Sequence, residues 1–476
     1  MKGYRCLFYV VVVASILFIG QCAWSCSELF LNNEFRISAR TMEFLIPMFP
    51  QMVLSPRGVE RTALLPSEGD TPITWTAKYG SVSIYAFGQN ICTDGINEHG
   101  LSAAILWCED SKYPTQQSDR AMSINYWAQY FLDMHLNVAD AVVDARDLKL
   151  YNPLQALISA NLHLVLHDSS GDSAVLEYDG LGNLNVYRPD STPTAYNGVM
   201  TNEPFYPLQI ANLMNYKPWG GALDLPGDYE SESRFVRGSY CLKEMYSSVS
   251  HQAAVGAAFQ FIEYLAWPYM SSIDPPPWFT LWTAVRDHAD LTYYFTTMLK
   301  PGVRSAYLNY LDFTAGQSMK MQGLDDSNEG DVGGGFLAMD YHPNGLNSYK
   351  PLSINPYKLF PQFPFSYTLY LGQNITKAFD LYVVATGAGQ TWTIYLDGKV
   401  EEGIKPVLKN QPGARAPILL SVTPGAVFPI EARGQQVTFY VVAVEAGKIP
   451  PSPSLEGLAE NTPNVIYMDK EPMTIK

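Results

Sequence analysis

The sequence is poor in cysteine and in long apolar segments, and each shortage narrows what the protein can be. Two of its six cysteines lie in the first 25 residues, so four remain for the rest of the 476-residue chain, too few for a disulfide-built scaffold. The apolar run over residues 7–20 is about fourteen residues long, short of the roughly twenty that cross a bilayer, and no later run is long enough. We therefore expect a soluble protein with free thiols and no membrane span.

Charged residues are also scarce, at 16% of the chain, and most of them are acidic. The formal net charge is −15, and loss of Lys2 and Arg5 with the first 25 residues would make it −17 (−15 − 2). A balance this acidic argues against nucleic acid and anionic membrane surfaces as partners. The aromatic content of 13% predicts instead a β-rich, well-buried globular protein.

Residues 1–25 have the features of a secretory signal peptide. A positively charged start precedes the apolar run, and Ala23 and Ser25 are small residues at the two positions that signal peptidase reads. Cleavage there would make Cys26 the first residue, with a thiol and a free α-amine. We therefore predict an exported protein, periplasmic or secreted. The alternative, a lipid on Cys22, is disfavoured by the residues before it.

Strand and helix patterns follow one another without regular alternation. Residues 29–31 and 35–40 read as a hairpin, which places Arg40 on the strand beside Cys26. Residues 94–100 read as a turn. Further strands are expected over 81–87, 102–107, 162–167, 173–178, 279–285, 291–296 and 304–309, and helices over 123–134, 138–148 and 252–265. This order predicts an α+β fold rather than alternating βαβ units.

The composition changes near residue 325, where an acidic, Gly-rich stretch is typical of a flexible linker. Short alternating strands follow it and predict a small all-β sandwich. The predicted organisation is a signal peptide over 1–25, a main domain over 26–323, a Gly-rich linker over 324–345, a β-sandwich-like domain over 346–450 and a Pro-rich tail over 451–476.

An N-terminal cysteine carries both a nucleophile and its base. The α-amine has a reference pKa of about 8 and can take the thiol proton directly or through one water. The thiolate is the reactive form, and a nearby guanidinium stabilises it, which makes Arg40 a candidate partner of Cys26. The simpler interpretation gives neither residue a catalytic role. Cys26 is then just the first residue after an arbitrary cleavage site, and Arg40 is a charged residue on the surface of its strand.

Five motifs occur in one order and at compatible spacings. They are Cys26, Ala39–Phe44, Asp94–Leu101, Gly198–Asn202 and the stretch Leu225–Phe235. Together they resemble the choloylglycine hydrolase family, which contains the bile salt hydrolases and penicillin V acylases, over about residues 26–323. The resemblance implies an N-terminal nucleophile hydrolase with a four-layer αββα core.

The resemblance also implies roles around the nucleophile. Cys26 would attack the substrate, Arg40 would lie against its sulfur, and Glu43 stands where the family usually has an Asp bonded to the terminal amine. A Glu carboxylate lies one methylene further out. Positions 40 and 43 also face opposite sides of a regular strand, so both can reach Cys26 only if the strand bulges or ends near Met42.

Three further residues would complete the site. The Asn202 side chain and the Trp107 backbone N–H would bind the developing oxyanion, and Arg234 would complete the polar cluster. Penicillin V acylases tend to have Tyr, and bile salt hydrolases Asn, where this chain has Trp107. A flat apolar wall at that position favours an aromatic or long aliphatic acyl group over conjugated bile salts.

Other kinds of site find little support. The sequence has no Gly-x-Ser-x-Gly, phosphate loop or nucleotide fingerprint, so we predict no cofactor. His163 and His167 lie on a predicted strand, where residues four apart are about 13 Å from each other, so we predict no metal there. His99 could serve as the base of a Cys–His pair, although its turn explains it as a surface residue.

We therefore predict a hydrolase that cleaves the linear amide of small N-acyl compounds, such as penicillin V or N-acyl homoserine lactones. Two alternatives stand beside it. One is a bile salt hydrolase, and the other is a non-catalytic exported binding protein on the same scaffold, with the C-terminal strands as its working part. The sequence leaves open whether the chain forms a homo-oligomer.

Overall fold

The computed structural model describes most of residues 26–339 and parts of the chain beyond. The described ranges are 26–32, 34–44, 48, 50–63, 70–86, 90–152, 161–245, 250–268, 279–327, 329–339, 352–354, 367–371, 378–387, 390–395, 399–411, 418–421, 436–448 and 465–474. The predicted signal peptide lies outside them. None of the helices within these ranges has the length and apolar character that a membrane crossing needs.

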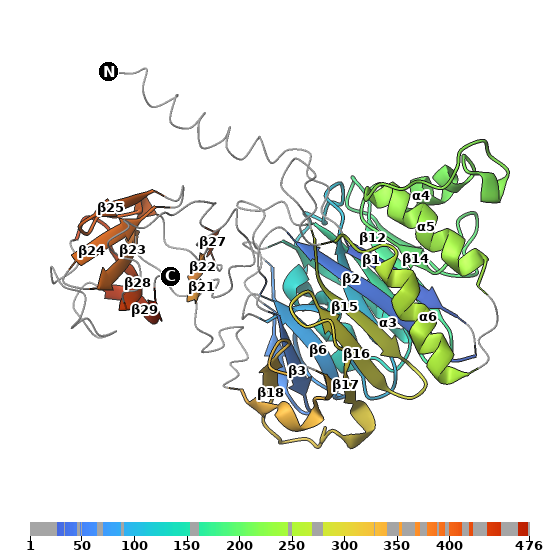
Figure 1. The fold of residues 1–476 in the computed structure, drawn as a ribbon, viewed down its shortest axis with the longest axis horizontal. Helices are drawn as coiled ribbons and strands as arrows, with labels where there is room; N and C mark the ends of the chain where they lie inside the picture. Colours follow the sequence, from blue (N-terminus) through green and yellow to red (C-terminus); the bar gives the residue numbers. More distant parts are fainter. Residues whose placement is uncertain are drawn as a thin grey trace.

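Two large sheets form the core (Figure 1). The first has seven strands in the spatial order β14 (Val199–Met200), β1 (Cys26–Leu31), β2 (Ile37–Phe44), β15 (Phe279–Asp287), β16 (Thr292–Thr297), β17 (Arg304–Tyr307) and β19 (Gly330–Asp331). The second has nine in the order β13 (Leu184–Tyr187), β12 (Ser173–Tyr178), β11 (Leu162–His167), β8 (Ser102–Trp107), β7 (Ile91–Asn97), β6 (Ser81–Ala86), β3 (Gln51–Ser55), β18 (Lys320–Gly323) and β20 (Leu337–Ala338).

Helices cover the outer faces of both sheets. On the first sheet, α5 (Ser231–Lys243) and α6 (His251–Glu263) pack over β1, β2 and β15, with α4 (Tyr206–Leu213) beside α5. On the second, α2 (Trp127–Met134) packs over β6, β7 and β8, and α3 (Val138–Ala145) over β12. The layers therefore run helix, sheet, sheet, helix, and the predicted α+β class is confirmed.

Small elements connect these layers. They are the strand pairs β4 (Glu60–Thr62) with β5 (Thr74–Thr76) and β9 (Ala121–Ser123) with β10 (Lys149–Tyr151), and the 3₁₀ turns η1 (Ile124–Tyr126), η2 (Lys217–Trp219), η3 (Leu308–Tyr310) and η4 (Gly333–Gly335).

The predicted N-terminal hairpin is present and sets the face of each site residue. In the β1–β2 register Cys26 lies opposite Met42, and Glu28 lies opposite Arg40. These four residues share one face of the sheet, because side chains alternate along a strand. Arg40 reaches backbone oxygens in β7 and β8, so that face is the one that packs on the second sheet. Glu43 lies on the other face, toward the helices.

The stretch 94–100 differs from its predicted turn. Residues 91–97 form β7, and the turn is confined to residues 98–100. Gly95 has a packing role here, because a Cβ on it would lie 2.7 Å from the Ser83 Cβ and 2.8 Å from a Leu132 methyl of α2. A glycine and an aspartate that resemble turn residues therefore mark the place where a buried strand passes close to a helix.

Helix α5 has no counterpart in the sequence prediction. It buries two arginines, Arg234 and Arg237, so its inward face lacks a clear apolar stripe. It also contains Gly238, where a Cβ would lie 2.9 Å from the Leu29 side chain. The glycine that lowers its helix propensity is what lets α5 approach β1.

Strands continue beyond the predicted main domain. Within the predicted linker, β19 pairs with β17 and β20 pairs with β18, so residues 330–338 extend both sheets instead of running free. Further on, one sheet joins β25 (Val400–Glu402), β24 (Gln390–Ile394), β23 (Phe379–Gly387), β28 (Gln436–Glu445) and β29 (Val465–Thr474), with β26 (Leu408–Gln411) on β23. Another joins β21 (Leu352–Ile354), β22 (Tyr367–Leu371) and β27 (Ile418–Ser421). Strand β29 lies in the predicted tail; the domain boundaries themselves stay predictions.

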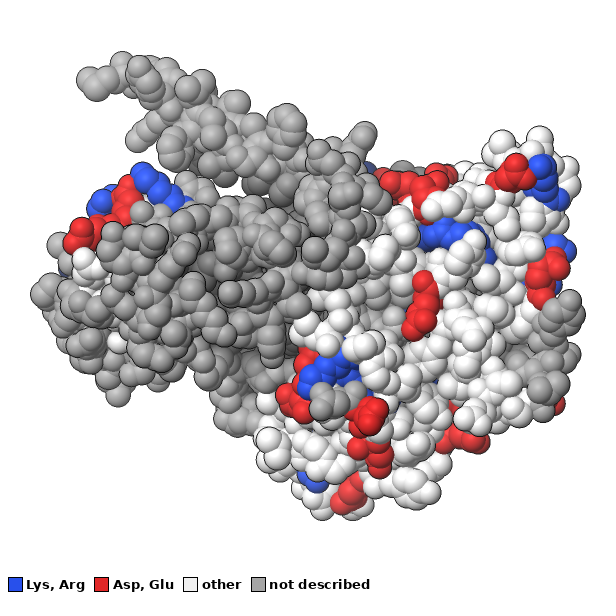
Figure 2. All heavy atoms as spheres, in the orientation of Figure 1, with Lys and Arg blue, Asp and Glu red and all other residues white. Residues whose placement is uncertain are grey.

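The cysteines are unpaired, and the charged side chains on the surface are scattered. Cys26, Cys92, Cys108 and Cys241 are all free, as predicted, although Cys241 is only half-buried. Over the described residues of the face in Figure 2, acidic and basic side chains are interspersed among uncharged ones.

Candidate active site

Cys26 is held by both of its backbone polar groups. It begins β1 and is 5% exposed. Its nitrogen donates to Asn202 Oδ1 at 2.6 Å, and its carbonyl oxygen accepts from Arg234 Nη1 at 2.6 Å. Asn202 lies two residues after β14, the edge strand of the same sheet, and Arg234 comes from α5. The position of the first strand residue is therefore fixed from two other elements.

Asn202 joins most of the predicted site into one network. Its Oδ1 also accepts from Arg234 Nη2 at 2.8 Å, and its Nδ2 donates to the carbonyl oxygen of Trp107 at 3.0 Å. Its own backbone N–H donates to the Ser231 hydroxyl at 2.9 Å. The structure thus brings together Cys26, Trp107, Asn202 and Arg234, which are far apart in the sequence.

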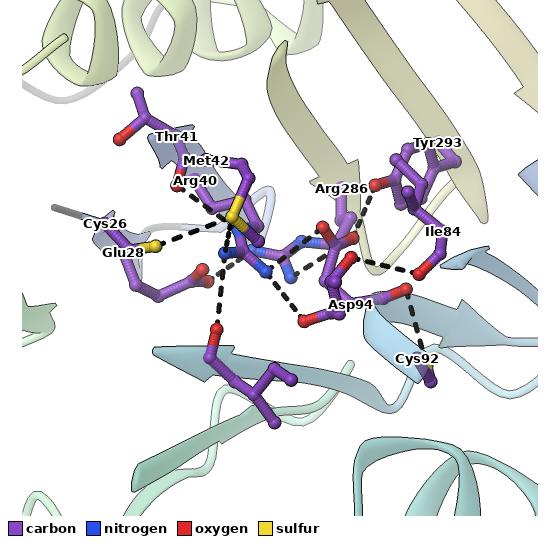
Figure 3. Close-up of polar contacts among 12 residues, drawn as sticks. Cys26, Glu28, Arg40, Thr41, Met42, Ile84, Cys92, Asp94, Arg286 and Tyr293 are labelled. Carbon is purple, nitrogen blue, oxygen red and sulfur yellow. Dashed lines mark hydrogen bonds and ion pairs between the residues drawn. The ribbon is translucent and has the colours of Figure 1, made fainter. Parts of the chain in front are cut away.

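Arg40 lies near the Cys26 sulfur, with Met42 in contact with both. The Met42 sulfur is 3.6 Å from Cys26 Sγ and 3.8 Å from Arg40 Nη2 (Figure 3). Arg40 Nη1 donates to the Thr93 carbonyl at 2.7 Å and forms an ion pair with Asp94 at 3.3 Å, and both charged side chains are fully buried. Arg40 is therefore a fixed buried charge beside the thiol and not a surface residue.

The balance of effects on Cys26 favours the protonated thiol. Burial raises the pKa of Cys26 and outweighs the positive charges of Arg40 and Arg234, which lower it, while the Glu43 carboxylate raises it further. A thiol in this state is a weak nucleophile, because the thiolate is the reactive form. The site consequently needs a base that removes the proton when a substrate is bound.

Glu43 lies on the helix-facing side of β2, as the alternation of side chains predicts. Its carboxylate accepts from the Thr280 hydroxyl at 2.5 Å and from the Thr41 hydroxyl at 3.0 Å. Burial raises the pKa of Glu43 to about 7, against the charge of Arg234 and these hydroxyls, which lower it. The contact to the Cys26 nitrogen expected of Glu43 is made by Asn202 instead.

For both Arg40 and Glu43 to reach Cys26, β2 would have to bulge or end near Met42. The structure has a bulge on the neighbouring strand β15 instead. Strand β2 runs in register to Phe44, whereas the register of β15 shifts between Thr280 and Trp282. The extra residue turns the Thr280 hydroxyl onto the Glu43 carboxylate.

A set of buried charges beneath Cys26 was not predicted. Arg286 of β15 pairs with Glu28 of β1, and Tyr293 of β16 donates to Asp94 (Figure 3). The set consists of two acidic and two basic residues, all fully buried: Glu28, Asp94, Arg40 and Arg286. Asp94 was within reach of sequence reasoning because it stands in a recognised motif. Glu28, Thr280 and Arg286 occur in ordinary strand patterns that carry no such signal.

The three histidines weighed from the sequence have separate surroundings. His99 is exposed in the turn after β7 and packs against Tyr79. His163 and His167 are buried in β11, where His163 contacts Glu177 and His167 lies 3.2 Å from Glu28. His163 and His167 therefore have different acidic partners, as their strand spacing predicts.

A cavity of about 310 Å³ lies next to the residues that hold Asn202. It is lined by Asp110, Glu203, Pro204, Glu230, Ser231 and Glu232. Ser231 connects it to the site, because its hydroxyl accepts the Asn202 backbone N–H.

The raised pKa of Glu43 predicts a pH-dependent stability. Its folded pKa of about 7 exceeds the ordinary Glu value of 4.5, so the stabilisation is complete below pH 4.5 and is lost as the pH rises through 7. Between about pH 5 and about pH 8 the wild type should lose about 2 to 3 kcal/mol more unfolding free energy than Glu43→Gln, measured by urea denaturation.

The exposed Glu329→Gln provides the matched control and should keep the wild-type pH dependence. Equal losses in wild type and Glu43→Gln would mean that the Glu43 carboxyl titrates as it does in the unfolded chain.

Comparison with known proteins places this geometry in a family. A model of the linear amide C–N hydrolases, choloylglycine hydrolase family, matches residues 26–322. The chain is 28% identical to penicillin V acylase from Pectobacterium atrosepticum over 361 residues, which is 71% of this chain and 89% of that protein. The solved penicillin V acylase from Agrobacterium tumefaciens is 30% identical, with a TM-score of 0.58 over 67% of this chain and 98% of its own. A variant of the conjugated bile acid hydrolase from Clostridium perfringens shares the fold at 19% identity, with a TM-score of 0.51 over 63% of this chain and 98% of its own. The chain belongs to the choloylglycine hydrolase family and is a linear amide C–N hydrolase of the penicillin V acylase and bile salt hydrolase type.

Proposed function

We propose that this hydrolase is an exported amidase of the penicillin V acylase kind, with Cys26 as its N-terminal nucleophile. The observation that carries the proposal is a pair of hydrogen bonds at the Cys26 backbone. The Cys26 nitrogen donates to Asn202, and the Cys26 carbonyl oxygen accepts from Arg234. The start of the family match at Cys26 and the 28% and 30% identities to penicillin V acylases support it. Removal of residues 1–25 by signal peptidase would free the α-amine during export to the periplasm or the medium.

The terminal amine of Cys26 is the base in this mechanism. It takes the thiol proton, directly or through one water, and the sulfur attacks the amide carbonyl carbon. A sulfur–carbon bond forms, the carbon–nitrogen bond breaks, and the leaving amine receives the proton from the Cys26 ammonium. Water then attacks the thioester, which releases the carboxylic acid and restores the thiol.

Asn202 provides one donor to the oxyanion of each tetrahedral intermediate. Its amide group has two N–H bonds, and one is directed to the Trp107 carbonyl at 3.0 Å. The second is the donor for the substrate oxygen, and the Trp107 backbone N–H is proposed as its partner. A fixed donor of this kind is worth about 3 to 4 kcal/mol in the transition state.

Trp107 is proposed to select the acyl group. It is the last residue of β8, its carbonyl is held by Asn202, and its side chain is 7% exposed. In this proposal the indole lines the space for the acyl group and presents a flat apolar wall, which suits a phenoxyacetyl or long aliphatic acyl chain. Penicillin V and N-acyl homoserine lactones both carry acyl groups of this kind.

Replacement of the nucleophile tests the mechanism directly. Cys26→Ala should lower kcat for penicillin V hydrolysis by about 10⁴-fold or more, because no other group on this chain forms the thioester. Amine release is the assay, and an unchanged thermal unfolding temperature shows that the fold is retained.

Cys241→Ser, at a half-buried thiol of α5, is the matched control and should keep full activity. Undiminished hydrolysis by Cys26→Ala would end the proposal. Intact mass measurement of the exported protein should give Cys26 as the first residue, and a start upstream of Cys26 would require a further cut.

Replacement of Trp107 tests the proposed preference for aromatic or long aliphatic acyl groups. Trp107→Ala should lower kcat/KM for phenoxyacetyl and decanoyl amides by about tenfold or more, mostly through KM, since the lost contact is apolar. An acetyl amide of the same amine is the internal control and should be affected much less. An equal loss for acetyl and decanoyl substrates would assign Trp107 to the reaction itself rather than to acyl binding.

The C-terminal strands are proposed to form a separate β-sandwich-like domain that takes no part in the reaction. The family match ends at residue 322, and strands β19 and β20 complete the two core sheets before residue 340. Deletion of residues 346–476 should therefore leave kcat/KM within about threefold of wild type. A folded core that has lost hydrolysis would show instead that these strands contribute to the site.

A further inference from the structure

A second cluster of reactive side chains lies behind the active site. Cys108 directly follows Trp107 at the end of β8, His163 lies on β11, and Glu177 lies on β12. One potential ligand atom from each residue lies within 4.8 Å of the other two. All three side chains are buried, at 1% exposure or less. No step of the proposed hydrolysis uses them.

The hydrogen bonds of His163 determine its tautomer. Its Nε2 lies 2.8 Å from the carbonyl oxygen of Thr201, which can only accept, so Nε2 carries a hydrogen. Its Nδ1 lies 3.2 Å from a Glu177 carboxylate oxygen. If the ring were neutral, the lone pair of Nδ1 would face the Glu177 carboxylate in a buried place, and the two would repel each other. Either a proton on Nδ1 or a cation between the groups must separate them.

The electrostatic surroundings favour a positive charge at this point. Cys108 and Glu177 both lie against the His163 ring, so two groups that can carry a negative charge face it. The Glu203 carboxyl is also near His163, and its buried Oε2 has no hydrogen-bond partner within the described part of the chain.

The ligand types match a borderline-soft metal ion. A thiolate, an imidazole nitrogen and a carboxylate oxygen are the three groups that bind Zn²⁺ in proteins. A metal-bound histidine usually donates its other ring N–H to a carbonyl or a carboxylate, as His163 does to Thr201. Thiolate and carboxylate together also neutralise a divalent ion, which lowers the cost of burying it.

We propose that Cys108, His163 and Glu177 bind one thiophilic divalent cation of the Zn²⁺ type. The ion would have a structural role, because His163 holds the carbonyl of Thr201, and the next residue is Asn202 of the active site. Glu177 also accepts the Tyr206 backbone N–H at the start of α4, so both ends of residues 201–206 are tied to the cluster.

The test uses the full chain with Cys26→Ala as the parent protein. This change removes the only other thiol proposed to be reactive, and the readout does not depend on hydrolysis. Cobalt(II), added after removal of bound metal, should give a thiolate-to-metal charge-transfer band at about one ion per chain. Metal analysis of the same protein from zinc-supplemented culture should give about one zinc per chain.

Variants in that parent assign the site. Cys108→Ser should lose the band and the tightly bound metal, and Cys241→Ser should keep both. The partly exposed cluster of His251, Asp287 and Asp290 has no sulfur, so a cation bound there cannot produce the band. If Cys108→Ser does not fold, His163→Gln and Glu177→Gln apply the same criterion.

Two results would overturn the proposal. One is a folded parent that takes up neither cobalt with a thiolate band nor zinc. The other is a Cys108→Ser protein that retains the metal. In either case the cluster is a protonated His163 held between Cys108 and Glu177.

Discussion

The structure depends on the burial of Arg40 between the two sheets. A guanidinium with no access to water is tolerated only with a charged partner and with its N–H groups bonded, and Asp94 and the carbonyls of Thr93 and Ile105 provide both. Arg286 and Glu28 form a second pair beside the first, so the region carries no net charge. The result is a fixed positive charge beside Cys26 that costs no rearrangement when a substrate arrives.

That fixed charge does not by itself activate Cys26, the proposed nucleophile. Burial raises the pKa of Cys26 by more than the two arginines lower it, so the resting site holds a thiol. An amine on the same residue suits such a site, because it is a base that needs no further side chain in a crowded space.

The sequence predicts the parts of the site that are local or lie in motifs. Cys26 and Arg40 belong to one hairpin, so a short turn is enough to place them together. Glu28 and Arg286 are separated by 258 residues, and only the order of strands β1, β2 and β15 brings them into contact. The contact of Thr280 with Glu43 was also beyond reach, because it depends on a register shift in β15 that the sequence does not signal. Helix α5 was missed since arginines, serines and a glycine occupy most of its buried positions, which leaves no clear apolar stripe.

Asn202 explains how cleavage could activate the enzyme without moving it. In the uncleaved chain the Cys26 nitrogen is a peptide N–H, and it already donates to Asn202 Oδ1 at 2.6 Å. Loss of the preceding residues would change that nitrogen from an amide into a base while leaving its partner in place. The new amine would then lie on the same residue as the thiol, with Asn202 Oδ1 still accepting one of its hydrogens. In the proposed mechanism, geometry assembled before cleavage and basicity gained by it would together keep Cys26 inert until residues 1–25 are removed.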